Sequence, residues 1–224
     1  MKYAINSIAA YAYWTASRGL FVAGVLAFTG CAWQNREARP AVFDFGPGSL
    51  SAASASPAQA SPLIIGELEA STALDGTAVL YRLAYDDAQQ LRAYAQARWS
   101  MPPVELLRQR LRQRLGENRA LQNPGESSAS RALAATAPPA TLRIELEEFS
   151  QLFESPQRSV GLLRLRATLL RTSAAGEKSL FQRQFVVQRP CASADAPGGV
   201  RALTAATDAA LQELQQWLQT LDQH

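Results

Sequence analysis

An apolar run that ends in Gly30-Cys31 constrains this chain more than any other feature, because it separates an export signal from a mature protein. Positive charge from Lys2 and Arg18 precedes eleven uncharged residues, 20–30. A basic start, an apolar run and small residues before a cut are typical of an export signal. A membrane-spanning helix needs roughly 20 apolar residues. We therefore expect residues 1–30 to be cleaved as a signal peptide.

The residues around this cut, Phe28-Thr29-Gly30-Cys31, resemble a lipobox. The resemblance implies that diacylglycerol is attached to the thiol of Cys31 and that the new amino terminus receives an N-acyl lipid. Several acyl chains hold a protein stably at a membrane where one chain would bind reversibly. Ala32 stands where an acidic residue commonly retains Gram-negative lipoproteins in the inner membrane, which favours the outer membrane. An ordinary cleaved signal or an uncleaved anchor is the alternative.

The mature chain, residues 31–224, is long enough for one domain with a sizeable core. Composition predicts a tether over 31–42, a single domain over 43–224 and flexible loops near 49–61 and 123–140. Removing the signal takes two basic residues from 22, so that 20 basic and 19 acidic side chains leave a charge of +1.

Hydrophobic periodicity predicts the secondary structure of this domain. Alternating or short apolar runs indicate β-strands, and a stripe at spacings of three and four indicates an α-helix. Pro102-Pro103 suits the start of a helix that Gly116 would end, and Gly198-Gly199 would separate the last strand from a terminal helix. The expected strands lie near 42–46, 63–68, 79–84, 142–147, 163–169 and 181–187. Residues 90–95 are ambiguous between strand and helix, and the terminal helix carries the stripe Leu203, Thr207, Ala210, Leu214, Trp217 and Leu221.

Together these elements predict an α+β fold, a two-layer, largely antiparallel β-sheet with two main helices packed on one face. If the strands near 142–147 and 163–169 pair antiparallel, Glu145 and Glu147 share a face with Arg164 and Arg166. Periodicity alone does not predict the order of the strands.

The types of residue present argue against an enzyme. The only histidine, His224, is the last residue, so neither a histidine-based triad nor a zinc site is expected. Gly46-Pro47-Gly48 lacks the lysine and the following helix of a phosphate-binding loop. Cys191 is the only thiol besides Cys31 and has no partner for an intramolecular disulfide. We expect no catalysis, no metal and no cofactor beyond the lipid on Cys31.

Three arginines and one tryptophan are candidates for binding a partner. Arg108 and Arg112 lie one turn apart on the helix that starts at Pro103, where a basic face could bind anionic headgroups or an acidic protein. Arg98 and Trp99 come just before this helix. The alternatives are a solvated face whose arginine stems cover apolar neighbours, and cation–π packing between Arg98 and Trp99.

The order of several motifs carries a resemblance to a known family. A lipoprotein signal is followed by Leu80-Tyr81-Arg82, then by Tyr94, Arg98-Trp99 and the double-proline helix start. This order resembles the ABC-type transport auxiliary lipoprotein component family, the group that includes paraquat-inducible protein C. The likeness is most specific over residues 94–111, and the order of elements extends it from about residue 43 to the terminal helix.

The resemblance implies a non-enzymatic, lipid-anchored periplasmic subunit that works with an Mce-domain substrate-binding protein and an inner-membrane ABC permease and ATPase. Such systems move lipids or hydrophobic compounds between the inner and outer membranes. The expected role is to dock the transporter to the outer membrane, with homo-oligomer formation left open and nucleic acid excluded by compartment. An independent envelope lipoprotein that itself binds or carries lipid is the alternative.

Overall fold

The computed structural model describes residues 39–48, 60–124, 139–172, 176 and 178–223. The predicted signal peptide 1–30, Cys31, most of the tether and most of both predicted loops lie outside these residues, as does His224. From Pro40 onward the described chain forms one compact unit.

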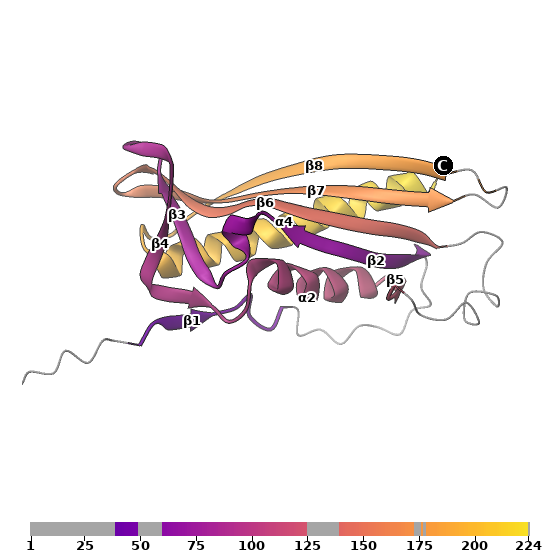
Figure 1. Cartoon of the computed structure of the whole chain (residues 1–224), viewed down its shortest axis with the longest axis horizontal. Helices are drawn as coiled ribbons and strands as arrows, with labels where there is room; N and C mark the ends of the chain where they lie inside the picture. Colours follow the sequence, from indigo (N-terminus) through magenta and orange to yellow (C-terminus); the bar gives the residue numbers. More distant parts are fainter. Residues whose placement is uncertain (1–38, 49–59, 125–138, 173–175, 177, 224) are drawn as a thin grey trace, which may run out of the picture. The chain divides into compact units, whose positions relative to one another are not determined.

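Eight strands of the described chain form one sheet, which is accompanied by two α-helices and a short 3-10 helix (Figure 1). The strands are β1 (Ala41–Phe43), β2 (Ala60–Ala70), β3 (Ala78–Leu83), β4 (Asp87–Trp99), β5 (Arg119–Gln122), β6 (Ala140–Ser155), β7 (Arg158–Thr172) and β8 (Lys178–Pro190). The helices are η1 (Thr72–Leu74), α2 (Pro103–Gly116) and α4 (Ala196–Asp222).

The sheet is built around β6, which is paired along both of its edges. On one edge β7 runs antiparallel to β6, and β8 runs antiparallel to β7. On the other edge β2 and then β3 pair in parallel with successive parts of β6. β4 follows β3 in antiparallel pairing, and the short strands β1 and β5 end this side of the sheet. The predicted α+β class is confirmed: the two longest pairings are antiparallel, and shorter parallel pairings make the sheet mixed.

Alternation of apolar and polar residues explains the two longest strands. One face of β6 and β7 is buried through Leu142, Ile144, Leu146, Leu163, Leu165, Ala167 and Leu169. On the other face Arg166 forms ion pairs with Glu145, at 3.9 Å, and with Glu147. β6 and β7 pair antiparallel, which is the condition under which these acidic and basic side chains were expected to share a face.

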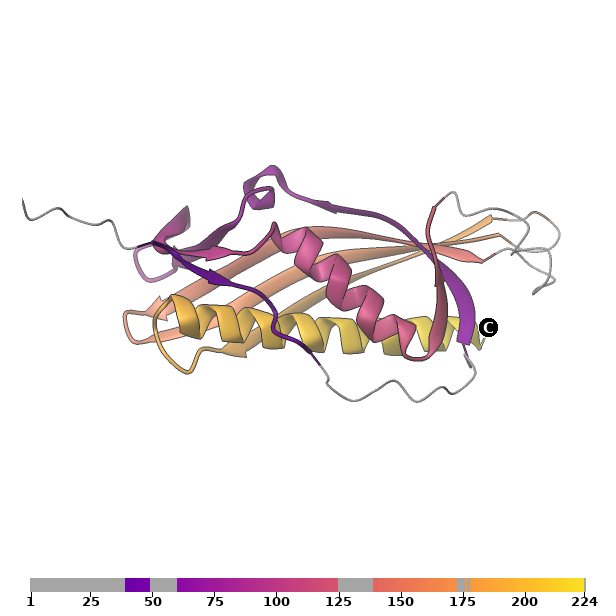
Figure 2. The ribbon, with the colours of Figure 1, turned by 90° about the horizontal axis from the view of Figure 1, so that it is seen from below.

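Both α-helices lie on one face of the sheet (Figure 2). Pro103 is in the first turn of α2, as predicted, because its missing N–H group has no partner to lose there. The buried stripe of α2 includes Leu107, Leu111 and Leu115. No helix in the described part of the chain is long and apolar enough to cross a membrane.

The terminal helix α4 begins earlier than predicted. Asp195 caps it by accepting a hydrogen bond from the backbone N–H of Gly198 at 2.8 Å, so Gly198-Gly199 lie inside the helix and not before it. The reason is close packing: a Cβ on Gly199 would collide with the side chain of Gln151. Likewise, a Cβ on Gly161 in β7 would lie 2.7 Å from the backbone of α4. These glycines allow α4 to approach the β6–β7 hairpin closely.

The predicted stripe of α4 is buried over its first four positions and less so at its end. Its buried members are Leu203, Thr207, Ala210 and Leu214. Trp217 is only half-buried and packs edge-on against Phe185 of β8, with ring centroids 6.0 Å apart. The end of this stripe therefore lies at the margin of the core.

Three other segments were left ambiguous by the sequence, were not predicted, or differ from the prediction. The ambiguous residues 90–95 are part of β4, and β5 was not predicted. The strand expected over 42–46 ends at Phe43. Gly46 has a φ of +67°, a left-handed conformation that interrupts a strand, and Phe45 is buried in the core beside it.

Candidate partner-binding site

Trp99, at the end of β4, is a core residue. Only 2% of its surface is exposed. Its ring packs edge-on against Phe45, with centroids 5.6 Å apart, and lies at the same distance from the ring of Phe149. Trp99 is therefore not available for direct contact with a partner, contrary to its selection from the sequence. The sequence of a strand does not show whether an aromatic side chain is buried or exposed, because that depends on which elements pack against the strand.

Arg98 is exposed, although it is the neighbour of Trp99 in β4. Successive side chains of a strand point to opposite faces, so the core position of Trp99 directs Arg98 to solvent. It is paired in register with Val42 of β1, which is 66% exposed. In the described part of the chain the Arg98 guanidinium forms no ion pair. Arg98 thus remains a surface cation beside an exposed apolar side chain.

The arginines of α2 do not form one free basic face. Arg108 is ion-paired with Glu105 at 3.2 Å and also donates a hydrogen bond to the backbone carbonyl of Leu68 at 3.4 Å. Arg112 donates to Oδ1 of Asn123 at 2.7 Å. Both side chains are half-buried, and their guanidinium groups tie α2 to neighbouring segments. The two arginines are close in space, as predicted, but each already has a polar partner.

Arg110, on the same helix, lies almost completely inside the protein. Its guanidinium donates to the backbone carbonyl of Phe45 and lies 3.2 Å from Oδ1 of Asp208, so it joins α2 to α4 and to the segment after β1. Beside it is a cavity of about 530 Å³, whose charged lining residues are Arg110, Arg114, Glu117 and Asp208. The helical spacing alone could not predict the burial of Arg110, because it does not show where the chain before β2 packs.

A buried polar network lies where β4, the β6–β7 hairpin and the start of α4 meet. Gln151 in β6 is fully buried. Its Oε1 accepts a hydrogen bond from the hydroxyl of Tyr94 at 2.8 Å, and its Nε2 donates to Oγ of Ser159 at 2.8 Å. Burial raises the pKa of the Tyr94 phenol, which therefore stays protonated and able to donate. No sequence motif identified this network, because its members are brought together only by strand pairing.

Replacing Gln151 by leucine is expected to lower the free energy of unfolding by about 1–3 kcal/mol, because polar groups of Tyr94 and Ser159 would lose their partner inside the protein. Equilibrium urea denaturation measures the change. Gln157→Leu, at an exposed position of the same hairpin, is the matched control and should change stability by less than about 0.5 kcal/mol. Equal effects of the two changes would contradict the structural role of the network.

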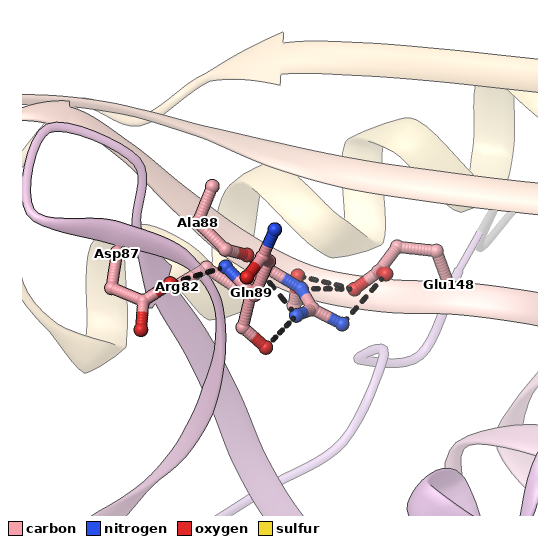
Figure 3. A network of polar contacts seen from close by, with 6 residues as sticks. Arg82, Asp87, Ala88, Gln89 and Glu148 are labelled. Atoms are coloured by element: carbon pink, nitrogen blue, oxygen red, sulfur yellow. Dashed lines mark hydrogen bonds and ion pairs between the residues drawn. The ribbon is translucent and has the colours of Figure 1, made fainter.

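A second polar network joins β3, the start of β4 and β6 (Figure 3). Arg82 donates from Nε and Nη2 to the two carboxylate oxygens of Glu148, at 3.3 and 3.1 Å. Its Nη1 donates to the backbone carbonyls of Ala88 and Gln89 at 3.3 and 3.1 Å. Every donor nitrogen of this guanidinium is used within the protein. Arg82 therefore positions the β3–β4 hairpin on the sheet and is not free to bind a ligand.

The described residues show no constellation typical of catalysis. No group of three or more His, Cys, Asp or Glu side chains in this part of the chain could hold a metal ion. Cys191 is half-buried, and burial raises the pKa of its thiol, which favours the less nucleophilic neutral form. The surface offers exposed charges and strand edges in place of a catalytic cluster.

A family model described as the ABC-type transport auxiliary lipoprotein component matches residues 47–215. The chain belongs to this family. The resemblance read from the order of the motifs is thereby confirmed. As an auxiliary lipoprotein of ABC-type transport, the protein is associated with a transport system of the cell envelope. The family description names an accessory component and not a catalyst.

Two solved structures share the fold of this auxiliary lipoprotein. A protein from Xanthomonas campestris has 21% sequence identity and a TM-score of 0.59, over 74% of this chain and 88% of that protein. An uncharacterised protein has 14% identity and a TM-score of 0.52, over 82% of this chain and 99% of its own. No curated protein is a significant match. At these identities the likeness extends to the fold alone.

Proposed function

We propose that this auxiliary lipoprotein is a non-enzymatic subunit that docks an Mce-type ABC transport system to the outer membrane on its periplasmic side. The match to the transport auxiliary family over residues 47–215 is the observation that carries the proposal. It covers all of α2, α4 as far as residue 215 and every strand except β1. The function therefore concerns the whole folded domain and not a short motif.

The anchor of this subunit is Cys31. The proposed mature protein begins there, carries diacylglycerol on the thiol and an N-acyl chain, and continues through the tether 31–42 into the domain 43–224. Each buried methylene of an acyl chain contributes about 0.8 kcal/mol to membrane binding. Positioning of the domain at the membrane, and not a chemical step, is the proposed mechanism.

The proposed partners are an Mce-domain protein and the inner-membrane permease and ATPase that it serves. Of the residues selected from the sequence, Arg98 is the best placed for direct contact, because it is exposed and has no ion pair within the described residues. Arg108 and Arg112 would contribute through the part of each side chain that reaches solvent. Trp99 would act by holding β4, and with it Arg98, in place.

The alternative role as an independent lipid carrier finds less support. Such a carrier needs an apolar space for acyl chains between the helices and the sheet. The cavity of about 530 Å³ beside α2 and α4 has four charged side chains in its lining, those of Arg110, Arg114, Glu117 and Asp208. Burying a hydrocarbon chain there would remove water from charged groups without replacing their hydrogen bonds.

Purification of the tagged full-length protein from its native envelope, after crosslinking, tests the proposed function. Mass spectrometry should find an acylated Cys31 at the amino terminus together with an Mce-domain protein and transporter subunits. Acylation with bound lipid but no transport protein would favour the independent carrier. An unmodified amino terminus would overturn the proposed anchor.

A further inference from the structure

Strand β8 forms a long boundary of the sheet. It pairs with β7 along Lys178–Pro190, and in the described residues its other edge has no partner strand (Figure 1). The sheet also ends at β1 and β5, which have three and four residues, and at the part of β4 before Ala97, whose pairing with β3 is interrupted by register shifts. Short edge strands offer few unpaired backbone groups, whereas a long one is a template for another strand. β8, with 13 residues, is the edge best suited to accept one.

The backbone groups that face this free edge can be identified from one hydrogen bond. The N–H of Cys191 donates to the carbonyl of Ser159 at 2.9 Å, and the register of β7 and β8 has no shift. Directly opposed residues of antiparallel strands alternate between bonded and non-bonded pairs. The backbone N–H and C=O groups of the odd-numbered residues of β8 therefore bond to β7. The backbone groups of the even-numbered residues point away from β7, toward the free edge. Pro190 agrees with this alternation, because it lacks an N–H group at an outward position.

The outward-facing part of β8 is compatible with strand pairing. Its residues are Leu180, Gln182, Gln184, Val186 and Gln188. None is charged, and Leu180 and Val186 are 64% and 52% exposed on the face of the sheet opposite the helices. Edge strands are usually protected by charges, proline or bulges along the edge. Among the positions whose backbone faces the free edge, lysine and proline occur only at the two ends, and the charge of Arg183 lies at a position whose backbone bonds to β7.

We propose that β8 binds an extended, acidic segment of the transport partner as a ninth strand of the sheet. The acidic character follows from charge: β8 carries Lys178, Arg183 and Arg189 and no acidic residue. Arg183 lies over the ring of Phe185 at 5.0 Å and, among the described residues, forms no ion pair. Two copies of β8 placed edge to edge would oppose three positive charges on each strand, which disfavours self-pairing. This inference rests on the proposed function, since the segment belongs to the transport complex.

Amide hydrogen exchange, resolved residue by residue, tests the pairing in the full-length protein and in the complex isolated through its tag. In the isolated protein the amides of Gln182, Gln184 and Val186 should exchange fast, and those of Arg183 and Phe185 slowly. In the complex the first three should become protected. Continued fast exchange in an intact complex would overturn the inference and leave the proposed function standing. Failure to isolate any transport complex would overturn both.

The same three amides are also measured in the isolated protein at increasing protein concentration. If their protection from exchange rises with that concentration, the occupant of the edge is a second copy of the chain. That result would overturn the acidic partner segment. Anionic vesicles of phosphatidylglycerol provide the remaining comparison, because a lipid surface lacks the ordered backbone acceptors of a strand. Protection of the three outward amides by vesicles alone would also contradict the proposal.

Gln184→Pro removes one outward N–H without removing a hydrogen bond to β7, and proline is tolerated where the N–H of an edge strand faces solvent. We expect about tenfold less transport complex to co-purify with this variant. Gln184→Ala is the matched control, because it removes the same side chain and keeps the N–H, and it should retain nearly all of the complex. Equal retention by both variants, at equal melting temperatures, would overturn the pairing. If Gln184→Pro does not fold, the exchange pattern of the unaltered protein decides.

Arg183→Glu tests the acidic character of the segment, with Arg183→Gln as the uncharged comparison. Charge reversal should reduce the co-purifying complex several-fold more than neutralisation, because it adds repulsion to the loss of attraction. An undiminished complex with Arg183→Glu would overturn an acidic occupant.

Discussion

Replacing Trp99 by alanine is expected to lower the free energy of unfolding by about 3–5 kcal/mol. The ring is almost completely buried, and it contacts Phe45 and Phe149 at centroid distances of 5.6 Å. Removing it would leave a cavity between the chain that follows β1 and the centre of the sheet. Equilibrium urea denaturation of the full-length protein in detergent measures the effect.

Arg98→Ala is the matched control for this prediction, because Arg98 is the adjacent residue of the same strand and is exposed. Its replacement should change the free energy of unfolding by less than about 0.5 kcal/mol. The same variant should reduce the amount of co-purifying transport complex if Arg98 contacts the partner. Near-normal stability of Trp99→Ala would contradict the core position of the ring. A normal amount of complex with Arg98→Ala would remove Arg98 from the proposed surface.

The parts of the fold that could be predicted from the sequence are those in which buried apolar residues recur at a regular spacing. β6 alternates between apolar and polar residues over 142–147 and β7 over 163–169, so the strand character of both could be predicted, whereas their pairing could only be assumed. The stripe of α4 from Leu203 to Leu214 was predicted because its apolar residues recur at spacings of three and four. β4 stayed ambiguous because its exposed and half-buried residues carry no clear period. β5 has four residues, too few for any pattern to be recognised.

The prediction was wrong for two glycines whose role is to allow close packing and not to separate two elements. Gly198-Gly199 looked like a break before the terminal helix, since glycine often separates elements. Both are inside α4, where a side chain on Gly199 would collide with Gln151. The close approach of a helix to a hairpin depends on residues nearly 50 positions apart, and a local pattern contains no information about it.

The candidate site shows the same limit. Arg108 and Arg112 were correctly placed on one helix, but their partners Glu105, Leu68 and Asn123 show that these cations also hold the fold together. The free edge of β8 could not be predicted at all. Whether a strand lies at an edge depends on the order of strands in the sheet, and that order is decided by pairings between distant segments.

Replacing Cys31 by alanine is expected to abolish acylation and to remove the protein from the outer membrane. The thiol of residue 31 is the group of the proposed lipobox to which diacylglycerol would be attached, and the proposed cut lies just before it. The described part of the chain has no helix that is long and apolar enough to cross a membrane. Fractionation of the envelope and mass spectrometry of the amino terminus measure the loss.

Cys191→Ala is the matched control, because it removes the only other thiol of the chain. Cys191 is half-buried and burial raises the pKa of its thiol, so this residue is not expected to carry lipid. The control protein should remain acylated and in the outer membrane. Cys31→Ala should leave the melting temperature of the domain unchanged, since the domain begins after the proposed tether. Retention of Cys31→Ala in the outer membrane would show that another segment anchors the protein, and the proposed docking role would then lose its lipid anchor.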